Sequence, residues 1–265
     1  MYSSFQIAKK YIRYYLTASN GRGHGIHSPF VFDFIKNVLR DKKENDRFAA
    51  IEAVRKNLLN DTRVITVEDF GAGSAVIKTR QRVVKDIAAS SLKAKKYAQL
   101  LFRIVQYYQP QTIIELGTSF GISTAYMACG NNNAVVYTCE GANEIAAIAS
   151  TNFQVIGAKN IELMSGDFSA TLPNIAKKVK KVDLAFIDGN HRKEPTLQYF
   201  STLLDLSTPD TILIFDDIHW SKEMEEAWES MKQHPSVTMS IDLFFIGILF
   251  FKTDFKVPQH FSIRF

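Results

Sequence analysis

The second half of the chain alternates short apolar runs with longer segments whose apolar residues recur at helical spacing. The apolar runs, read as strands, lie at 112–116, 135–140, 161–167, 182–189 and 211–217, and helical segments such as 143–157, 195–206 and 222–234 lie between them. Such alternation is typical of a parallel sheet with helices on both faces. Two last runs, 237–243 and 245–252, are too close for a crossover helix and should pair antiparallel at the sheet edge. The pattern predicts an α/β fold with a doubly wound, mostly parallel, seven-stranded sheet.

The first 95 residues have a different pattern, which predicts a helical extension. Residues 5–16 form an amphipathic pattern with cations between the apolar positions, and shorter helical patterns lie at 33–39 and 48–59. A further helix is expected over 91–109, ending before Pro110. We therefore expect residues 1–95 to form a substrate lid or a dimer element, and residues 96–265 to form the main domain.

Composition is that of an ordered globular protein, with 46% hydrophobic residues and a net charge of +5. The charge is uneven: residues 1–110 hold 20 Lys and Arg against 9 Asp and Glu, whereas residues 111–265 hold 12 against 18. A solvated basic surface and an anionic partner both fit this imbalance.

Cys129 and Cys139 lie in apolar stretches, as buried thiols of a reducing compartment do. With no signal-peptide pattern and no apolar run long enough to span a bilayer, we expect a cytoplasmic protein.

The run at 112–116 leads into a turn that has the features of a ligand cradle. Gly117 and Gly121 lie on either side of Thr118, Ser119 and Phe120, and a helical pattern follows. Glycine lets the backbone approach a ligand closely, and a helix N-terminus offers free N–H groups. A tight α/β connection has the same local pattern. A similar run at 64–74 lacks an acidic residue closing a second strand about 20 residues later. Its glycines, Gly71 and Gly73, are therefore interpreted as loop residues that serve the backbone, with a substrate-side loop as the alternative.

Acidic residues end the predicted strands of the second half. Ligands of open parallel sheets bind outside the carboxyl ends of the strands. Helix capping explains one or two carboxylates there but not all of them. The residues are Glu115, Glu140, Asp167, Asp188, Asp216 and Asp217.

With these features, residues 95–252 resemble the class I S-adenosylmethionine-dependent methyltransferases, and among them the small-molecule O-methyltransferases of the catechol and caffeoyl-CoA type. The resemblance is carried by ELGTSFGIST at 115–124, SGDFSATL at 165–172, FIDGNHRKEP at 186–195 and LIFDDIHW at 213–220. It implies a Rossmann-like methyltransferase fold. The turn lacks the middle glycine of G-x-G-x-x-G, which favours S-adenosylmethionine over a dinucleotide. The cofactor-binding residues that it implies are Glu115, Gly117, Thr118, Ser119, Gly121, Ser123, Glu140, Asp167 and Phe168.

The resemblance also implies a site for the methyl acceptor. Metal-dependent relatives hold a divalent cation with acidic residues that correspond to Asp188, Asp216 and Asp217, a set suited to Mg²⁺ or Mn²⁺. His191 corresponds to a basic side chain and is the expected general base, with Asp188 as its catalytic partner at the metal. His219 is an alternative base or a supporting residue.

The expected reaction is therefore methyl transfer to a hydroxyl of a small molecule by a homodimeric enzyme. Methylation of RNA or protein through the basic N-terminal region is an alternative, favoured less because no N-P-P-Y motif is present. A non-catalytic cofactor-binding protein is the third hypothesis. The first 90 residues lie outside the motifs, so the acceptor cannot be read from the sequence.

Overall fold

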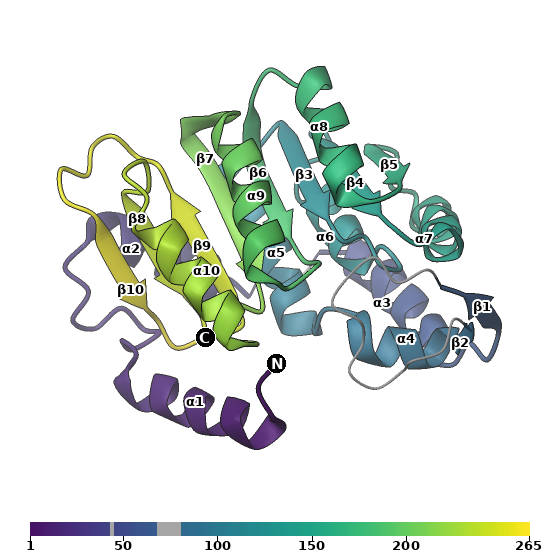
Figure 1. Cartoon of the computed structure of the whole chain (residues 1–265), viewed down its shortest axis with the longest axis horizontal. Coiled ribbons are helices and arrows are strands. Elements are labelled where there is room, and N and C mark those ends of the chain that lie inside the picture. The colour runs from purple at the N-terminus through teal and green to yellow at the C-terminus, as the bar shows by residue number, and fades with distance from the viewer. Residues whose placement is uncertain (43–44, 68–80) are drawn as a thin grey trace. The chain divides into compact units, whose positions relative to one another are not determined.

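Strands and helices alternate as predicted from residue 112 onward in the computed structural model of the protein, which describes residues 1–42, 45–67 and 81–265 (Figure 1). The chain forms two compact units. Residues 42–178 are called the middle unit here, and residues 1–41 with 179–265 the terminal unit. Gly71 and Gly73 lie outside the described residues.

The middle unit contains three parallel strands in the order β3-β4-β5, with a separate antiparallel β1–β2 pair. In chain order its elements are α3 (Arg47–Leu58), β1 (Val64–Thr66), β2 (Gln81–Val83), α4 (Val84–Ser91), α5 (Lys95–Tyr108), β3 (Thr112–Leu116), α6 (Ile122–Gly130), β4 (Val135–Glu140), α7 (Asn143–Ile156), β5 (Ile161–Ser165) and α8 (Phe168–Lys178). Helix α5 ends as expected, at Gln109 in the left-handed conformation before Pro110. Aromatic and aliphatic side chains of α3 to α7 form one core, which includes Phe48, Phe102 and Tyr126.

The terminal unit contains five strands in the order β10-β8-β9-β7-β6. Its elements are α1 (Ser4–Thr17), α2 (Pro29–Phe34), the π-helix η1 (Ile35–Leu39), β6 (Val182–Ile187), α9 (Lys193–Leu204), β7 (Ser207–Asp216), α10 (Lys222–Lys232), β8 (Met239–Asp242), β9 (Ile246–Phe250) and β10 (Gln259–Ser262). Strands β6 and β7 are parallel, and β9 is antiparallel to both β7 and β8, as the short connection predicted. Helices α9 and α10 pack side by side (Figure 1).

Strand β10 corrects the predicted strand number, because apart from the separate β1–β2 pair the described strands are eight rather than seven. It pairs in parallel with β8, from Gln259 opposite Met239 to Ser262 opposite Asp242. Its four residues are exposed or only partly buried, so they lack the apolar run by which the other strands were recognised. Long-range backbone pairing alone defines this strand. The predicted α/β class with a mostly parallel sheet is confirmed.

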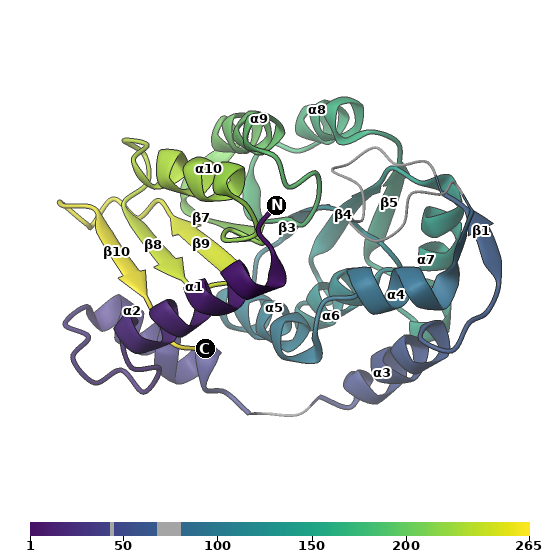
Figure 2. The same ribbon diagram turned by 60° about the horizontal axis from the view of Figure 1, so that its bottom comes forward.

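Helix α1 is a separate layer of the terminal unit. A capping box begins the helix: the Ser3 side chain accepts from the N–H of Gln6, and the Gln6 side chain accepts from the N–H of Ser3. Helix α1 lies against the terminal unit (Figure 2). Tyr11 and Tyr14 on its inner face pack on Phe244 of the β8–β9 connection. Among the described residues, no helix combines the length and the apolar composition needed to cross a bilayer.

Candidate functional site

The turn after β3 is built on positive backbone φ angles at Gly117 (106°), Ser119 (48°) and Gly121 (84°). Glycine adopts such angles without the penalty of a Cβ atom. A Cβ on Gly121 would lie 2.3 Å from Cε1 of Phe153, so this position also lacks space for a side chain. The N–H groups of Gly117 and Thr118 donate to the carbonyl of Cys139 at 3.0 and 3.1 Å. The turn is therefore fixed to the end of β4 and leads directly into α6.

Glu140, the last residue of β4, is bonded to the same turn. The N–H of Ser119 donates to its Oε2 at 2.8 Å, and the N–H of Ala142 donates to its Oε1 at 3.0 Å. Burial raises the pKa of Glu140, and these backbone hydrogen bonds oppose the increase. A carboxylate has about four acceptor sites, so Glu140 can accept a ligand hydroxyl besides these backbone N–H groups. The predicted turn and its predicted acidic residue thus form one connected structure.

Glu115 lies inside the unit, below the turn. It is fully buried, and its Oε1 accepts a hydrogen bond from Ser123 at 2.7 Å. Its Oε2 accepts from Thr138 at 2.6 Å and also from Thr124. The hydroxyl of Thr118, likewise buried, contacts that of Thr138 at 2.6 Å. These side chains, of which Glu115, Thr118 and Ser123 were predicted to bind the cofactor, hold β3, β4 and the start of α6 together.

Asp167 follows β5 and directly precedes α8. Its Oδ1 accepts from the backbone N–H of Ser169 at 2.8 Å and from the hydroxyl of the same residue. This is the local hydrogen bonding expected of an Asp at a helix N-terminus. Phe168, the first residue of α8, is partly buried. The capping interpretation therefore accounts for one oxygen of Asp167, and Oδ2 takes no part in the cap.

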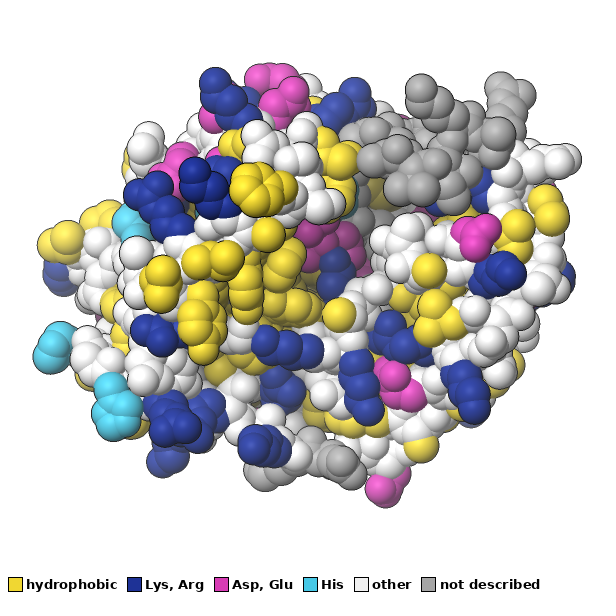
Figure 3. Space-filling model, turned by 90° about the horizontal axis from the view of Figure 1, so that it is seen from below, with side chains coloured by type: hydrophobic (Ala, Val, Ile, Leu, Met, Phe, Trp, Pro, Cys, Tyr) yellow, Lys and Arg dark blue, Asp and Glu magenta, His cyan; other side chains and the backbone are white. Residues whose placement is uncertain are grey.

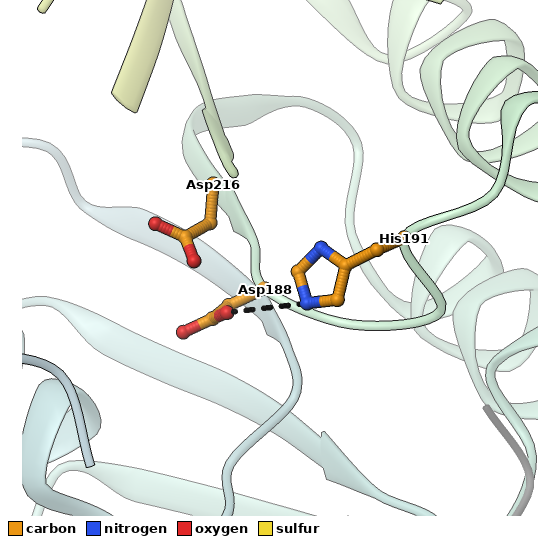
Figure 4. A group of neighbouring side chains, drawn as sticks. All are labelled: Asp188, His191 and Asp216. Atoms are coloured by element: carbon orange, nitrogen blue, oxygen red, sulfur yellow. Dashed lines mark ion pairs between the residues drawn. The ribbon is translucent and has the colours of Figure 1, made fainter. Parts of the chain in front are cut away.

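A second group of chemistry-bearing side chains lies in the terminal unit. Asp188 follows β6, His191 lies three residues later and Asp216 ends β7. Figure 4 shows the three side chains converging, with Nε2 of His191 3.8 Å from Oδ1 of Asp188. One ligand atom from each residue lies within 4.8 Å of the others. Asp216 is only 2% exposed. Two carboxylates and an imidazole at this spacing are a donor set that a divalent cation can use.

Asp217, the third predicted metal ligand, is not in this group among the residues that the structure describes. The chain leaves β7 at this residue with a φ of 54°, and the N–H of Asp217 donates to the carbonyl of Phe245 at 2.7 Å. The direction of a side chain beyond a strand end depends on that turn, and two consecutive residues seldom point the same way. The third member of the group is instead His191, which was predicted as a base.

His219, the predicted alternative base, bonds carboxylates through both ring nitrogens. Its Nδ1 is 3.0 Å from Oε1 of Glu225, and its Nε2 is 2.9 Å from Oδ2 of Asp242. Burial lowers the pKa of His219, but the two carboxylates outweigh this effect and raise the pKa overall. Glu225 also accepts from Lys10 at 2.9 Å and Tyr2 at 2.7 Å. This network links α1 to α10 and to the loop after β7. No sequence spacing indicates it, because its members come from distant parts of the chain.

Part of the chain is similar to known methyltransferases. Residues 114–218 match the family model described as a methyltransferase domain. A catechol O-methyltransferase from Niastella koreensis is 32% identical over 126 residues, which cover 46% of this chain and 55% of that protein. The chain thus spans about half the length of this curated relative.

Solved structures share the fold at low sequence identity. An O-methyltransferase from Bacillus cereus in complex with SAH is 21% identical with a TM-score of 0.57, over 83% of this chain and 97% of that one. An SAH-bound methyltransferase from Podospora anserina is 14% identical with a TM-score of 0.59, over 85% and 97%.

The fold and the turn therefore define an α/β protein with the Rossmann-like methyltransferase fold. Residues 114–218 match a methyltransferase domain, and 46% of the chain is similar to a catechol O-methyltransferase.

Proposed function

We propose that this protein transfers the methyl group of S-adenosylmethionine to a hydroxyl of a small molecule, with a divalent cation at the acceptor. The observation that carries the proposal is the hydrogen bond between the turn after β3 and the carboxylate that ends β4, from the N–H of Ser119 to Glu140. A glycine turn and an acidic residue joined in this way suit a nucleoside with free ribose hydroxyls.

In the proposed cofactor site, Gly117, Thr118, Ser119 and Gly121 surround the amino-acid part of the cofactor, and Glu140 accepts the ribose hydroxyls. Asp167 and Phe168 bind the adenine, by hydrogen bonding and ring contact respectively. Glu115 and Ser123 support the turn from below, as their mutual hydrogen bond suggests. The B. cereus structure, which was solved in complex with SAH, supports the choice of cofactor.

Asp188 and Asp216 are the proposed cation ligands, and His191 the proposed base. A bound Mg²⁺ or Mn²⁺ would lower the pKa of the acceptor hydroxyl. In the transfer, the acceptor oxygen forms a bond to the methyl carbon, the carbon–sulfur bond breaks with its electrons moving to sulfur, and the hydroxyl proton goes to His191. If His191 coordinates the cation instead, a nitrogen in the donor set favours Mn²⁺ over Mg²⁺.

Cofactor binding is the first test. Calorimetry with S-adenosylmethionine should show binding to the full chain, and Glu140→Ala should weaken it by about 10- to 100-fold, because charge-assisted hydrogen bonds contribute about 1.5–3 kcal/mol. Glu162→Ala is the matched control, since Glu162 lies on the neighbouring strand β5 with its side chain half exposed. An absence of heat at millimolar cofactor would refute the proposal.

The second test separates the roles of the terminal-unit residues. Asp216→Ala should abolish metal-dependent turnover, with catechol as the first acceptor tried, and leave cofactor affinity intact. His191→Ala should lower turnover without changing metal affinity if His191 is the base, and should weaken metal binding if it is a ligand. Equal activity of the wild type with and without chelator would remove the cation from the proposal.

The proposal includes a cytoplasmic location, supported by the free buried thiols of Cys129 and Cys139. The lid and homodimer roles expected of residues 1–95 also remain part of it. Nucleic acid is the less favoured substrate.

A further inference from the structure

Helix α1 has apolar side chains on two opposite faces, although the terminal unit covers only one of them. The inner face packs Ile7, Tyr11 and Tyr14 against Phe244 and Phe245. The rings of Tyr11 and Phe244 meet edge to face at 5.1 Å. This inner contact explains why the helix lies on the unit, but it leaves other apolar residues of α1 uncovered.

The outer face carries Phe5, Ile12 and Leu16, whose residues are 78%, 59% and 73% exposed. Spacings of seven and four residues place these side chains on one side of a helix. They form a stripe about 16 Å long at 1.5 Å per residue. We call Phe5, Ile12 and Leu16 the outer stripe. Figure 3, viewed from the side on which α1 lies in Figure 1, shows hydrophobic side chains gathered on this face with Lys and Arg side chains around them.

The charges along the outer stripe are all positive. The helix sequence SFQIAKKYIRYYLT contains no Asp or Glu. Lys9 and Arg13 are exposed and follow Phe5 by about one and two turns, so they border the stripe. Lys10 points elsewhere, since its Nζ bonds Glu225 at 2.9 Å. Residues 1–41 hold six Lys and Arg against two Asp.

These charges decide which occupant fits the stripe. Two copies of α1 packed through this face would bring Lys9 and Arg13 of each copy together with no carboxylate from either helix, which is unfavourable. An RNA would satisfy the cations but would leave Ile12 and Leu16 without an apolar environment. A bilayer that contains anionic lipids satisfies both, because apolar side chains enter the acyl boundary while cations meet the headgroups.

The helix is also ordered before any partner binds. Its N-terminus has the capping box, the side chains of Tyr2 and Lys10 are bonded to Glu225, and the hydroxyl of Tyr14 donates to the carbonyl of Ile263. A surface helix held in this way loses little conformational freedom on binding.

We propose that the outer face of α1 is a docking surface for an anionic lipid bilayer, on which the protein lies peripherally. Phe5, Ile12 and Leu16 enter the interface, and Lys9 and Arg13 bind the lipid headgroups. The inference is independent of the methyltransferase activity, since neither group of site residues takes part in it.

The test is co-sedimentation of the full chain with phosphatidylcholine vesicles, either pure or containing about a third phosphatidylglycerol. The wild type should bind the anionic vesicles, and added salt should weaken this binding. Lys9→Glu/Arg13→Glu should weaken it by at least about tenfold, since each cation contributes about 1 kcal/mol near such a surface. Ile12→Gln/Leu16→Gln should weaken it by at least as much, because burying one apolar side chain contributes about 1.5–3 kcal/mol.

Matched controls separate the stripe from general effects of polarity and charge. Val155→Gln/Val257→Gln removes two apolar side chains of similar exposure, 68% and 70%, outside α1. Lys56→Glu/Lys177→Glu makes the same change in net charge on exposed lysines of the middle unit. Both controls should bind like the wild type, and thermal unfolding should show that all four variants fold.

Three results would overturn the proposal. One is a wild type that does not bind anionic vesicles, and another is an outer-stripe variant that binds as well as the wild type. The third is a change from dimer to monomer in light scattering for Ile12→Gln/Leu16→Gln, which would assign the face to a second copy of the chain.

Discussion

Gly121→Ala should destabilise the protein much more than the same substitution at another left-handed glycine. Gly121 has a φ of 84°, and its new Cβ would lie 2.3 Å from Cε1 and 2.7 Å from Cζ of Phe153. Phe153 is buried in the middle unit, so its ring cannot move into solvent. The left-handed backbone costs about 1–2 kcal/mol for a residue with a Cβ atom. Overpacking a core adds about 1–3 kcal/mol. The expected loss in the free energy of unfolding is therefore about 2–5 kcal/mol.

Gly157→Ala is the matched control, because Gly157 has a φ of 75° with nothing within 4 Å of the new Cβ. Both substitutions carry the same backbone cost and the same effect on the unfolded chain, which cancel when the two are compared. The difference between the variants, about 1–3 kcal/mol, then measures the contact with Phe153 alone.

Urea unfolding of the wild type and both variants measures these free energies, provided that the slopes with denaturant are equal. Adding Phe153→Leu to each variant completes a double-mutant cycle, in which the shorter side chain should recover part of the loss at Gly121 only. Equal losses for the two alanine variants would show that the contact with Phe153 does not limit this turn, and the argument would fail.

Three further predictions concern single buried or partly buried groups. Glu115→Ala leaves three buried hydroxyls without their acceptor and should lower the free energy of unfolding by about 2–4 kcal/mol. Glu115→Gln keeps an acceptor oxygen and should lower it less. Equal losses for the two variants would contradict this prediction. Burial raises the pKa of Glu225, but hydrogen bonds from Lys10 and Tyr2 outweigh this effect, so the pKa is lowered overall. The ionised Glu225 therefore stabilises the fold above its ordinary pKa of 4.5, and this stabilisation is lost as the pH falls below that value. Glu225→Gln should therefore cost about 1–2 kcal/mol at pH 7 in thermal or urea unfolding, and its gap to the wild type should close in acid; a gap independent of pH would refute this assignment. Burial raises the pKa of Cys139 to about 11, so iodoacetamide should label this thiol far more slowly in the native chain than in urea, and equal rates would show that the thiol is accessible.

Most of the fold followed from the sequence because the central strands contain short apolar runs. All five residues of β9 and the last six of β7 are buried, and such runs stand out in any reading of the chain. Strand β10 has no such run, since its residues are partly buried or exposed in alternation, and only its pairing with β8 makes it a strand. Helix α4 was also not predicted from the sequence. The residues between the predicted loop at 64–74 and the predicted helix at 91–109 give no clear signal for a helix that starts at Val84.

The candidate sites were predicted unequally for a similar reason. The turn at Gly117 to Gly121 and the carboxylate of Glu140 depend on local backbone chemistry and on the strand order, and the sequence determined both. Which residues join Asp188 and Asp216 depends on the direction of the side chains that follow each strand. The left-handed backbone at Asp217 sets one of these directions, and the amino-acid types do not predict that conformation.

Helix α1 shows the same division between sequence and tertiary structure. The spacing of its apolar residues and the absence of acidic ones are properties of the sequence, and they determined that the helix is amphipathic and basic. Which apolar residues are covered was decided by Phe244 and Phe245, which lie more than 200 residues later in the chain and pack against Ile7, Tyr11 and Tyr14. A side chain is buried only when another surface packs on it, so the sequence of one helix cannot specify which of its residues are buried. Only the folded chain shows that Phe5, Ile12 and Leu16 stay exposed.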